Sequence, residues 1–262
     1  MKKIQTIIRK EWAEVFKNRW VLFTIIFLPL LFTAIPLVIL FATGSSGMGD
    51  LTSDMPPQFS QFCPPGLTGS ACFQVYLVSQ FMILFLLMPL IIPINIAAYS
   101  IVGEKTTRSL EPLLASPITT AELLIGKNLA AVIPAVLATW AGFIIFAIGT
   151  LLMTGASQVL RAFFSPIWLL AIFVLGPLMA VLSVNFSMMV SSRVNEPRAA
   201  EQLSTVVILP VMLLFLGQVT GFLLISQQVV LWFTAGALLL DILMIYVSVQ
   251  TFQRETILTR WK

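Results

Sequence analysis

The stretch VLFTIIFLPLLFTAIPLVILFA, residues 21–42, decides the fold of this chain, because it is long, apolar and free of charged side chains. A helix needs about 20 mainly apolar residues to cross the hydrocarbon core of a bilayer. This stretch therefore predicts a transmembrane helix. Apolar runs of similar length predict five more: Tyr76–Ala98, Gly126–Met153, Ile167–Val190, Thr205–Ile225 and Val229–Val249.

The composition agrees with a chain that lies mostly in lipid. Of its 262 residues, 58% are hydrophobic and 10% are charged, and the mean hydropathy is +0.99. A soluble domain carries about 25% charged residues. We therefore predict an all-α polytopic membrane protein with six transmembrane helices.

The basic residues indicate how the chain is oriented. With the N-terminus inside, 14 of the 15 Lys and Arg fall on the inner side, and only Arg161 lies outside. Since cytoplasmic loops carry the excess of basic residues, both termini are expected in the cytoplasm and the loop 43–75 outside. This distribution explains the net charge of +4 without a nucleic acid partner.

Residues 1–20 precede the first span and are predicted as a separate unit, an amphipathic helix in the plane of the headgroups. Its apolar residues recur at helical spacing: Ile4, Ile7, Ile8, Trp12, Val15 and Phe16. Two interpretations stay open, a simple membrane anchor and an elbow helix that also contacts a cytoplasmic partner. Residues 21–262 form the six-span domain.

The external loop 43–75 holds both cysteines of the chain, Cys63 and Cys72. The turn-forming sequence between them would let a disulfide close a small loop in an oxidising environment. Two free thiols are the alternative. A metal site is not expected, because the chain has no His to complete it.

Prolines interrupt five of the six spans, for example Pro89 and Pro93 in the second, Pro134 in the third and Pro177 in the fourth. Each proline removes one hydrogen bond within its helix, and the carbonyl thus freed needs a partner on a neighbouring helix. Ordinary kinked packing explains most of them. Kinks in so many spans also suit a bundle that changes shape.

The most informative polar segment is SIVGEKTTRSLEPLLASPITTAELLIGK, residues 100–127. Glu104 and Arg108 have the spacing of a helical ion pair. Pro112 and Pro117 would break the helix, and Thr119 with Glu122 forms a capping box that starts a new one. The pattern predicts a structured cytoplasmic knob over residues 100–122.

Several kinds of catalytic site are excluded. The only Gly-Lys pair, Gly126-Lys127, lacks the rest of a phosphate-binding loop, so the chain is not expected to hydrolyse nucleotides alone. Without His, zinc proteases, His-ligated haem and a Ser–His nucleophile are also excluded.

Asp241 is the only acid within a predicted span. A buried charge costs roughly 2.5–3.5 kcal/mol on insertion scales, so such an acid is a functional candidate by default. A packing acid hydrogen-bonded to a neighbour such as Asn185 or Gln218 is the other interpretation. Asn95, Asn185 and Gln218 are predicted to bond between helices, and together with Asp241 they are the candidates for a substrate or ion pathway.

The segment IVGEKTTRSLEPLLASPITTAELLIGK, residues 101–127, resembles the segment after the second span in permeases of the type-2 ABC exporter family. In that family a Gly-Glu-Lys run is followed by Leu-Glu-x-Leu-Leu-x-Ser-Pro and then by Glu-Leu-Leu-x-Gly-Lys. The six spans, the amphipathic N-terminal segment and the lack of a nucleotide site are similar as well.

The resemblance implies a permease that pairs with a second permease, identical or related, above two separate ATPase subunits. ATP and Mg would bind to those subunits, and no cofactor is expected in this chain. The residues implied in coupling to the ATPase are Gly103, Glu104, Lys105, Arg108, Leu110, Glu111, Leu113, Leu114 and Ser116.

The sequence thus favours the membrane half of an ATP-driven exporter in a prokaryotic cell membrane, with a lipid-like or amphipathic substrate. The alternative is an ion-coupled secondary transporter or a sodium exporter that uses Asp241. A membrane enzyme or scaffold is a further rival.

Overall fold

The computed structural model describes residues 2–45, 70–106, 118–154, 164–220, 222 and 226–251. Every element in these ranges is helical, and six helical stretches are long and apolar enough to cross a membrane, as predicted. The elements are α1 (Lys2–Lys17), α2 (Arg19–Ser45), α3 (Ser70–Phe85), α4 (Met88–Thr106), α6 (Thr120–Thr154), α8 (Pro166–Leu170), η3 (Ala171–Leu175), α9 (Gly176–Arg193), α10 (Pro197–Ser204), η4 (Thr205–Ile208), α11 (Leu209–Val219) and α12 (Gln227–Thr251).

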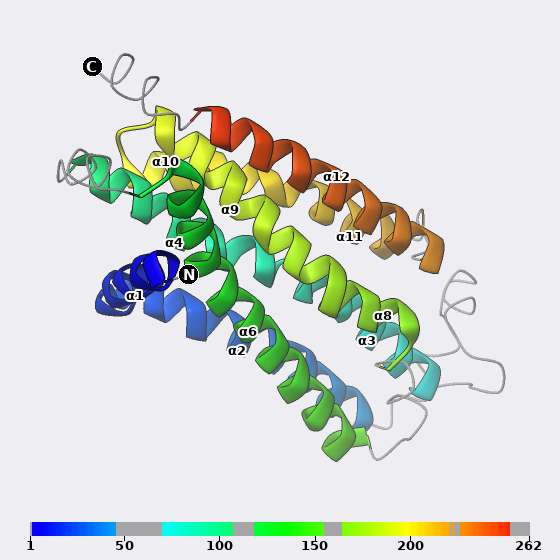
Figure 1. Ribbon diagram of the computed structural model, residues 1–262. Coiled ribbons are helices and arrows are strands. Elements are labelled where there is room, and N and C mark those ends of the chain that lie inside the picture. Colours follow the sequence, from blue (N-terminus) through cyan, green and yellow to red (C-terminus); the bar gives the residue numbers. More distant parts are fainter. Residues whose placement is uncertain are drawn as a thin grey trace.

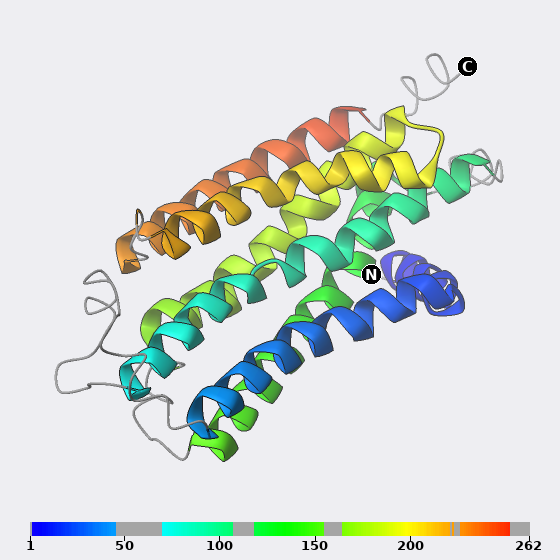
Figure 2. The ribbon, with the colours of Figure 1, turned by 180° about the vertical axis from the view of Figure 1, so that it is seen from behind.

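The spans run side by side, and α1 lies across one end of the bundle (Figures 1 and 2). That end also holds the end of α4, the start of α6, the α9–α10 junction and the end of α12. The second span is the most buried of the six. Of its most apolar 18 residues, 83% are buried inside the bundle, compared with 22% for the first span. Its half α4 packs on both α9 and α6.

The second span is interrupted ahead of Pro89. Helix α3 ends at Phe85 and α4 begins at Met88, so Leu86 and Leu87 form a turn between them. The N–H groups of these two residues donate to the carbonyls of Ile83 and Leu84, three residues back. Because Pro89 has no N–H, it cannot bond to the Phe85 carbonyl, and the α-helical ladder stops there.

Two other prolines leave carbonyls that tryptophans on neighbouring helices satisfy. Ala130 lies four residues before Pro134, and its carbonyl accepts a hydrogen bond from Nε1 of Trp12 in α1 at 2.9 Å. This contact ties α1 to α6.

The second case lies in the π-helical segment η3, which precedes Pro177. There the Gly176 N–H donates to the Ala171 carbonyl, five residues back. In the same five-residue register, the Ile172 carbonyl would accept from residue 177, but Pro177 has no N–H to donate. This carbonyl accepts a hydrogen bond from Nε1 of Trp140 instead, at 3.3 Å. The expectation that neighbouring helices bond to proline-freed carbonyls is confirmed at both places.

The fifth span begins earlier and ends earlier than its predicted range of 205–225. Helix α10 starts at Pro197, a residue suited to the first helical turn because no N–H is needed there, and the 3₁₀ turn η4 joins α10 to α11, which ends at Val219. The prediction followed apolarity alone, and α10 is polar (PRAAEQLS). The fourth span begins in the same way, with Ser165 as the N-cap of α8 and Pro166 as its first residue.

Helix α1 packs on α6 at a glycine. A Cβ atom at Gly126 would lie 2.8 Å from Cγ2 and 2.9 Å from Cβ of Ile7. Ile7 and Val15 are buried, whereas Phe16 is 52% exposed, so only part of the predicted apolar face is covered by the bundle. The position of α1 at a membrane surface stays a prediction.

We predict that Gly126→Ala loosens α1, although Ala normally stabilises a helix interior by about 1 kcal/mol relative to Gly. The added methyl group overpacks against Ile7, which typically costs roughly 1–3 kcal/mol. Thermal unfolding in detergent should show a lower midpoint than wild type. Gly236→Ala in α12 is the matched control, because nothing lies within 4 Å of a Cβ there. Equal stabilisation by both substitutions would contradict this packing.

Candidate functional site

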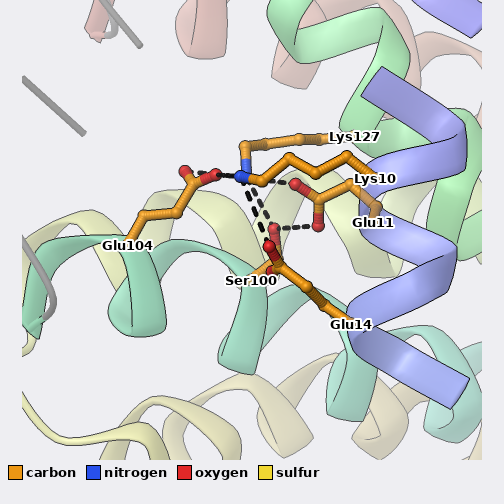
Figure 3. A network of polar contacts seen from close by, with 6 residues as sticks. All are labelled: Lys10, Glu11, Glu14, Ser100, Glu104 and Lys127. Carbon is orange, nitrogen blue, oxygen red and sulfur yellow. Dashed lines mark hydrogen bonds and ion pairs between the residues drawn. The ribbon is translucent and has the colours of Figure 1, made fainter. Parts of the chain in front are cut away.

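A network of charged side chains connects α1, α4 and α6 at the end of the bundle where α1 lies (Figure 3). Three helices that are distant in sequence meet at this point. Their contributions are Lys10, Glu11 and Glu14 from α1, Ser100 and Glu104 from α4, and Lys127 from α6.

Lys127 is the centre of the network. Its Nζ atom donates to Oε1 of Glu11 at 2.8 Å and to Oγ of Ser100 at 2.7 Å. It also lies 2.9 Å from Oε2 of Glu104, a contact with the distance of an ion pair but not the angles of a hydrogen bond. The ammonium group carries three N–H donors, and three oxygen atoms lie around it, two of which accept hydrogen bonds.

The two carboxylates are held from a second side as well. Ser100 donates from Oγ to Oε2 of Glu11 at 2.7 Å, and Nζ of Lys10 donates to Oε1 of Glu104 at 2.6 Å. Glu104 therefore bridges two lysines. Lys10 lies further from Glu14, at 3.6 Å.

The centre of the network is shielded from solvent. The side chains of Lys127, Glu11 and Glu104 are each 4% exposed, and Lys10 is 39% exposed. Charges removed from water are tolerated only with close partners and further hydrogen bonds, and this geometry supplies both. The loss of one partner would leave a buried charge uncompensated.

The electrostatics of α1 favour the charged forms. Burial raises the pKa of Glu11, but the charge and hydrogen bond of Lys127, together with Ser100 and Lys10, outweigh burial, so the pKa falls below its ordinary value of 4.5. Because its folded-state pKa is depressed, Glu11 stabilises the docked α1 above pH 4.5, and this contribution is lost as the pH falls through the folded-state pKa.

Lys10 shifts in the opposite direction. Burial lowers its pKa, but the hydrogen bond and charge of Glu104, with the charges of Glu11 and Glu14, raise it above 10.5. Its contribution is complete at neutral pH and is lost only as the pH rises through that raised value.

The structure places the predicted coupling residues only in part. Gly103, Glu104 and Lys105 lie in the last turns of α4, whereas the remaining members fall outside the described residues: Arg108, Leu110, Glu111, Leu113, Leu114 and Ser116. The Glu104–Arg108 pair therefore stays a prediction, and Glu104 is found between Lys10 and Lys127.

The Cys63–Cys72 pairing also stays a prediction. Cys72 is disulfide-bonded at the start of α3, but Cys63 lies outside the described residues.

The predicted capping box at the start of α6 is confirmed. The Glu122 N–H donates to Oγ1 of Thr119 at 3.2 Å, and the Thr119 N–H donates to Oε2 of Glu122 at 2.9 Å. Lys3 of α1 lies 3.8 Å from the same carboxylate. The segment 107–117 is thus flanked by Glu104 on one side and by the capping box and Lys127 on the other, and α1 contacts both flanks.

Sequence reasoning missed Glu11 and Ser100 and took Lys127 for an ordinary basic residue of the inner surface. One signal was available. Glu11 lies four residues from Ile7 and four from Val15, so it interrupts the buried stripe of α1. A charge in that position needs a partner on the helix against which the stripe packs.

The four candidates for a substrate or ion pathway lie on four different helices, α4, α9, α11 and α12. Among the described residues no hydrogen bond joins any two of them. Asp241 is 3% exposed, and neither carboxylate oxygen has a hydrogen-bond partner there. Asn185 donates to the Val181 carbonyl of its own helix at 2.9 Å, and Asn95 borders a cavity between α2, α4 and α10.

The model of a family described as "ABC-2 family transporter protein" matches residues 5–251, nearly the whole chain. The chain belongs to the ABC-2 transporter family. This ABC-2 protein is therefore a multi-pass membrane subunit of the permease type, as the resemblance at residues 101–127 implied. A search of curated proteins found no match.

We predict that Lys127→Met destabilises this ABC-2 protein strongly, since it leaves two buried carboxylates without their shared cation. Removing one partner of a buried ion pair costs about 3–5 kcal/mol. Lys3→Met is the matched control, because the Lys3–Glu122 pair is long and its side chains are 51% and 31% exposed. Such surface pairs contribute at most about 1 kcal/mol. Unfolding in detergent should separate the two variants, and equally mild effects would disprove the role of Lys127.

We predict that Asp241→Asn keeps or raises stability, because it preserves size and hydrogen-bonding atoms and removes the charge penalty of a span. Asn185→Asp is the reverse control. It introduces an acid at a residue that is 2% exposed and should lower the unfolding midpoint. Unfolding is measured with and without Na⁺. A wild-type midpoint that rises with Na⁺, and an Asp241→Asn midpoint that does not, would favour the ion-coupled alternative.

Proposed function

We propose that this chain is the membrane permease of an ATP-driven exporter, which works with two separate ATPase subunits and a second permease, identical or related. Membership of the ABC-2 family supports the permease. The observation that carries the coupling mechanism is the charge network. It joins α1 to both helices that flank the segment 107–117, which in this proposal contacts the ATPase.

The network would keep the flanks of this segment at a constant separation. Glu104 lies in the last turns of α4, and Lys127 lies two turns into α6. Because Glu11 bonds to Lys127 and Lys10 bonds to Glu104, a displacement of the segment would move α1, α4 and α6 together. A flexible loop would absorb the same displacement.

The displacement would then reach the centre of the bundle. Helix α4 packs on α9, α6 and α10, and it is separated from α3 by the break at Leu86-Leu87. This break would let the inner half of the span tilt while α3 stays in place. Alternating access needs such a relative motion of two halves around the transport path.

The proposed orientation puts α1, the segment 100–122 and both termini in the cytoplasm of a prokaryotic cell. The positive-inside rule supports it, and α1, the end of α4 and the start of α6 lie at one end of the bundle (Figure 1). ATP and Mg would bind to the ATPase subunits, and this chain would take no chemical part in hydrolysis.

The experiment is co-purification of the full chain with its ATPase subunit, followed by measurement of the ATPase rate. We expect Arg108→Glu, in the contact segment, to lower ATPase retention by at least about tenfold, which corresponds to roughly 1.4 kcal/mol. Arg193→Glu is the control, because Arg193 is an exposed basic residue at the end of α9, on the same end of the bundle.

Glu104→Gln tests the network itself. It keeps the size of the side chain but weakens the bridge between Lys10 and Lys127. We expect the ATPase to stay bound, while its stimulation by transported substrate is lost. Wild-type retention in Arg108→Glu together with wild-type stimulation in Glu104→Gln would disprove the proposed coupling path.

A further inference from the structure

A groove of about 520 Å³ opens between α2, α4, α10 and η4, and neither the coupling mechanism nor the packing of the core uses it. Most of its lining residues are polar: Thr24, Asn95, Tyr99, Arg198, Glu201, Gln202 and Thr205. Val21 and Tyr99 also line a smaller cavity of about 190 Å³ that reaches Glu11 and Ser100 of the charge network. The groove thus lies next to the network.

One of the residues that line the groove is an amide with free hydrogen-bonding capacity. Asn95 is 7% exposed, and its side chain has no hydrogen-bond partner among the described residues. The Asn95 amide is not among the fully buried side-chain atoms that lack a partner, so its polar atoms are open to the groove. Its position on the groove wall means that a bound molecule can supply the missing hydrogen bonds.

The wall formed by α10 carries one charge of each sign. Arg198 and Glu201 are three residues apart, and the charge of Arg198 acts on the Glu201 carboxylate, but no ion pair within 4.0 Å joins them among the described residues. Arg198 is exposed and Glu201 is half-buried. Two opposite charges on one wall that form no close ion pair complement a ligand that itself carries both an anionic and a cationic group. Glu201 would repel a head group that is purely anionic, and Arg198 would repel one that is purely cationic.

Apolar side chains continue from the groove along two spans. Leu209 and Leu213 follow Thr205 in the chain, share one face of α11 and are 56% and 66% exposed. On α2, Phe27 lies one turn beyond Thr24 and is 45% exposed. A hydrocarbon chain attached to a head in the groove can therefore lie along α2 and α11.

From these features we infer that the groove binds the head of a zwitterionic amphiphile, with a phosphate beside Arg198, an ammonium group beside Glu201 and a polar linker atom on the Asn95 amide. This inference rests on the proposed export function, since it names the class of molecule that the permease accepts from the inner leaflet. A second copy of the chain is the other possible occupant.

The test measures lipid binding to the full chain without any ATPase, so that a failure of the coupling mechanism does not affect it. The chain is purified in a maltoside detergent and offered phosphatidylethanolamine and phosphatidylglycerol with the same acyl chains in equal amounts. Bound lipid is counted by native mass spectrometry. We expect one phosphatidylethanolamine per chain, preferred over phosphatidylglycerol by about tenfold, or roughly 1.4 kcal/mol.

The variants separate the three contacts. Glu201→Gln should abolish the preference between the two lipids, Arg198→Gln should weaken both, and Asn95→Leu should weaken both while the charges stay in place. The controls are Arg193→Gln and Glu196→Gln, two exposed residues of the same surface that do not line the groove. Their binding should equal that of wild type.

Two results would overturn the inference. One is equal binding of the two lipids by wild type, or equal losses in groove and control variants. The other is a change in dimer dissociation, without a change in lipid binding, when Arg198→Gln and Glu201→Gln are combined. That result would assign the groove to the second copy.

Discussion

The charge of Lys127 must be neutralised inside the protein, and the arrangement of the end of the bundle where α1 lies depends on this constraint. A half-balanced network would be worse than an apolar contact, because each buried ion keeps its desolvation cost. Glu11 and Glu104 must therefore both reach Lys127, which brings α1 and α4 against α6 at one point. Apolar packing alone would let α1 slide along the bundle, since dispersion and burial are not directional.

The residues of the spans were predictable because lipid imposes a simple rule on their composition. The helix starts at Pro166 and Pro197 and the capping box at Thr119 were predictable as well, since each depends on chemistry within one helical turn. The fifth span was misplaced because α10 is polar and continues into an apolar helix. Composition cannot detect such a junction.

The network could not be predicted from composition, because its partners are 116 and 94 residues apart and look like ordinary surface charges in the sequence. The hydrogen bond between Trp12 and the carbonyl freed by Pro134 could not be predicted either. The sequence shows that the proline frees a carbonyl, but only the fold shows which indole reaches it. Of the candidate polar residues in the spans, Asn95 alone borders one of the two cavities described here, and this could not be read from its sequence neighbours.

The separation between Glu11 and Lys127 also has a consequence for biogenesis. Helix α1 leaves the ribosome long before its partner, since 116 residues lie between the two side chains. At about 5–20 residues per second, Lys127 is synthesised roughly 6 to 23 seconds after Glu11. During that time the Glu11 carboxylate has no Lys127 with which to pair, and the first span enters the membrane before the charge network can form. Closure of the network is thus a late step of assembly, which follows the insertion of the third span.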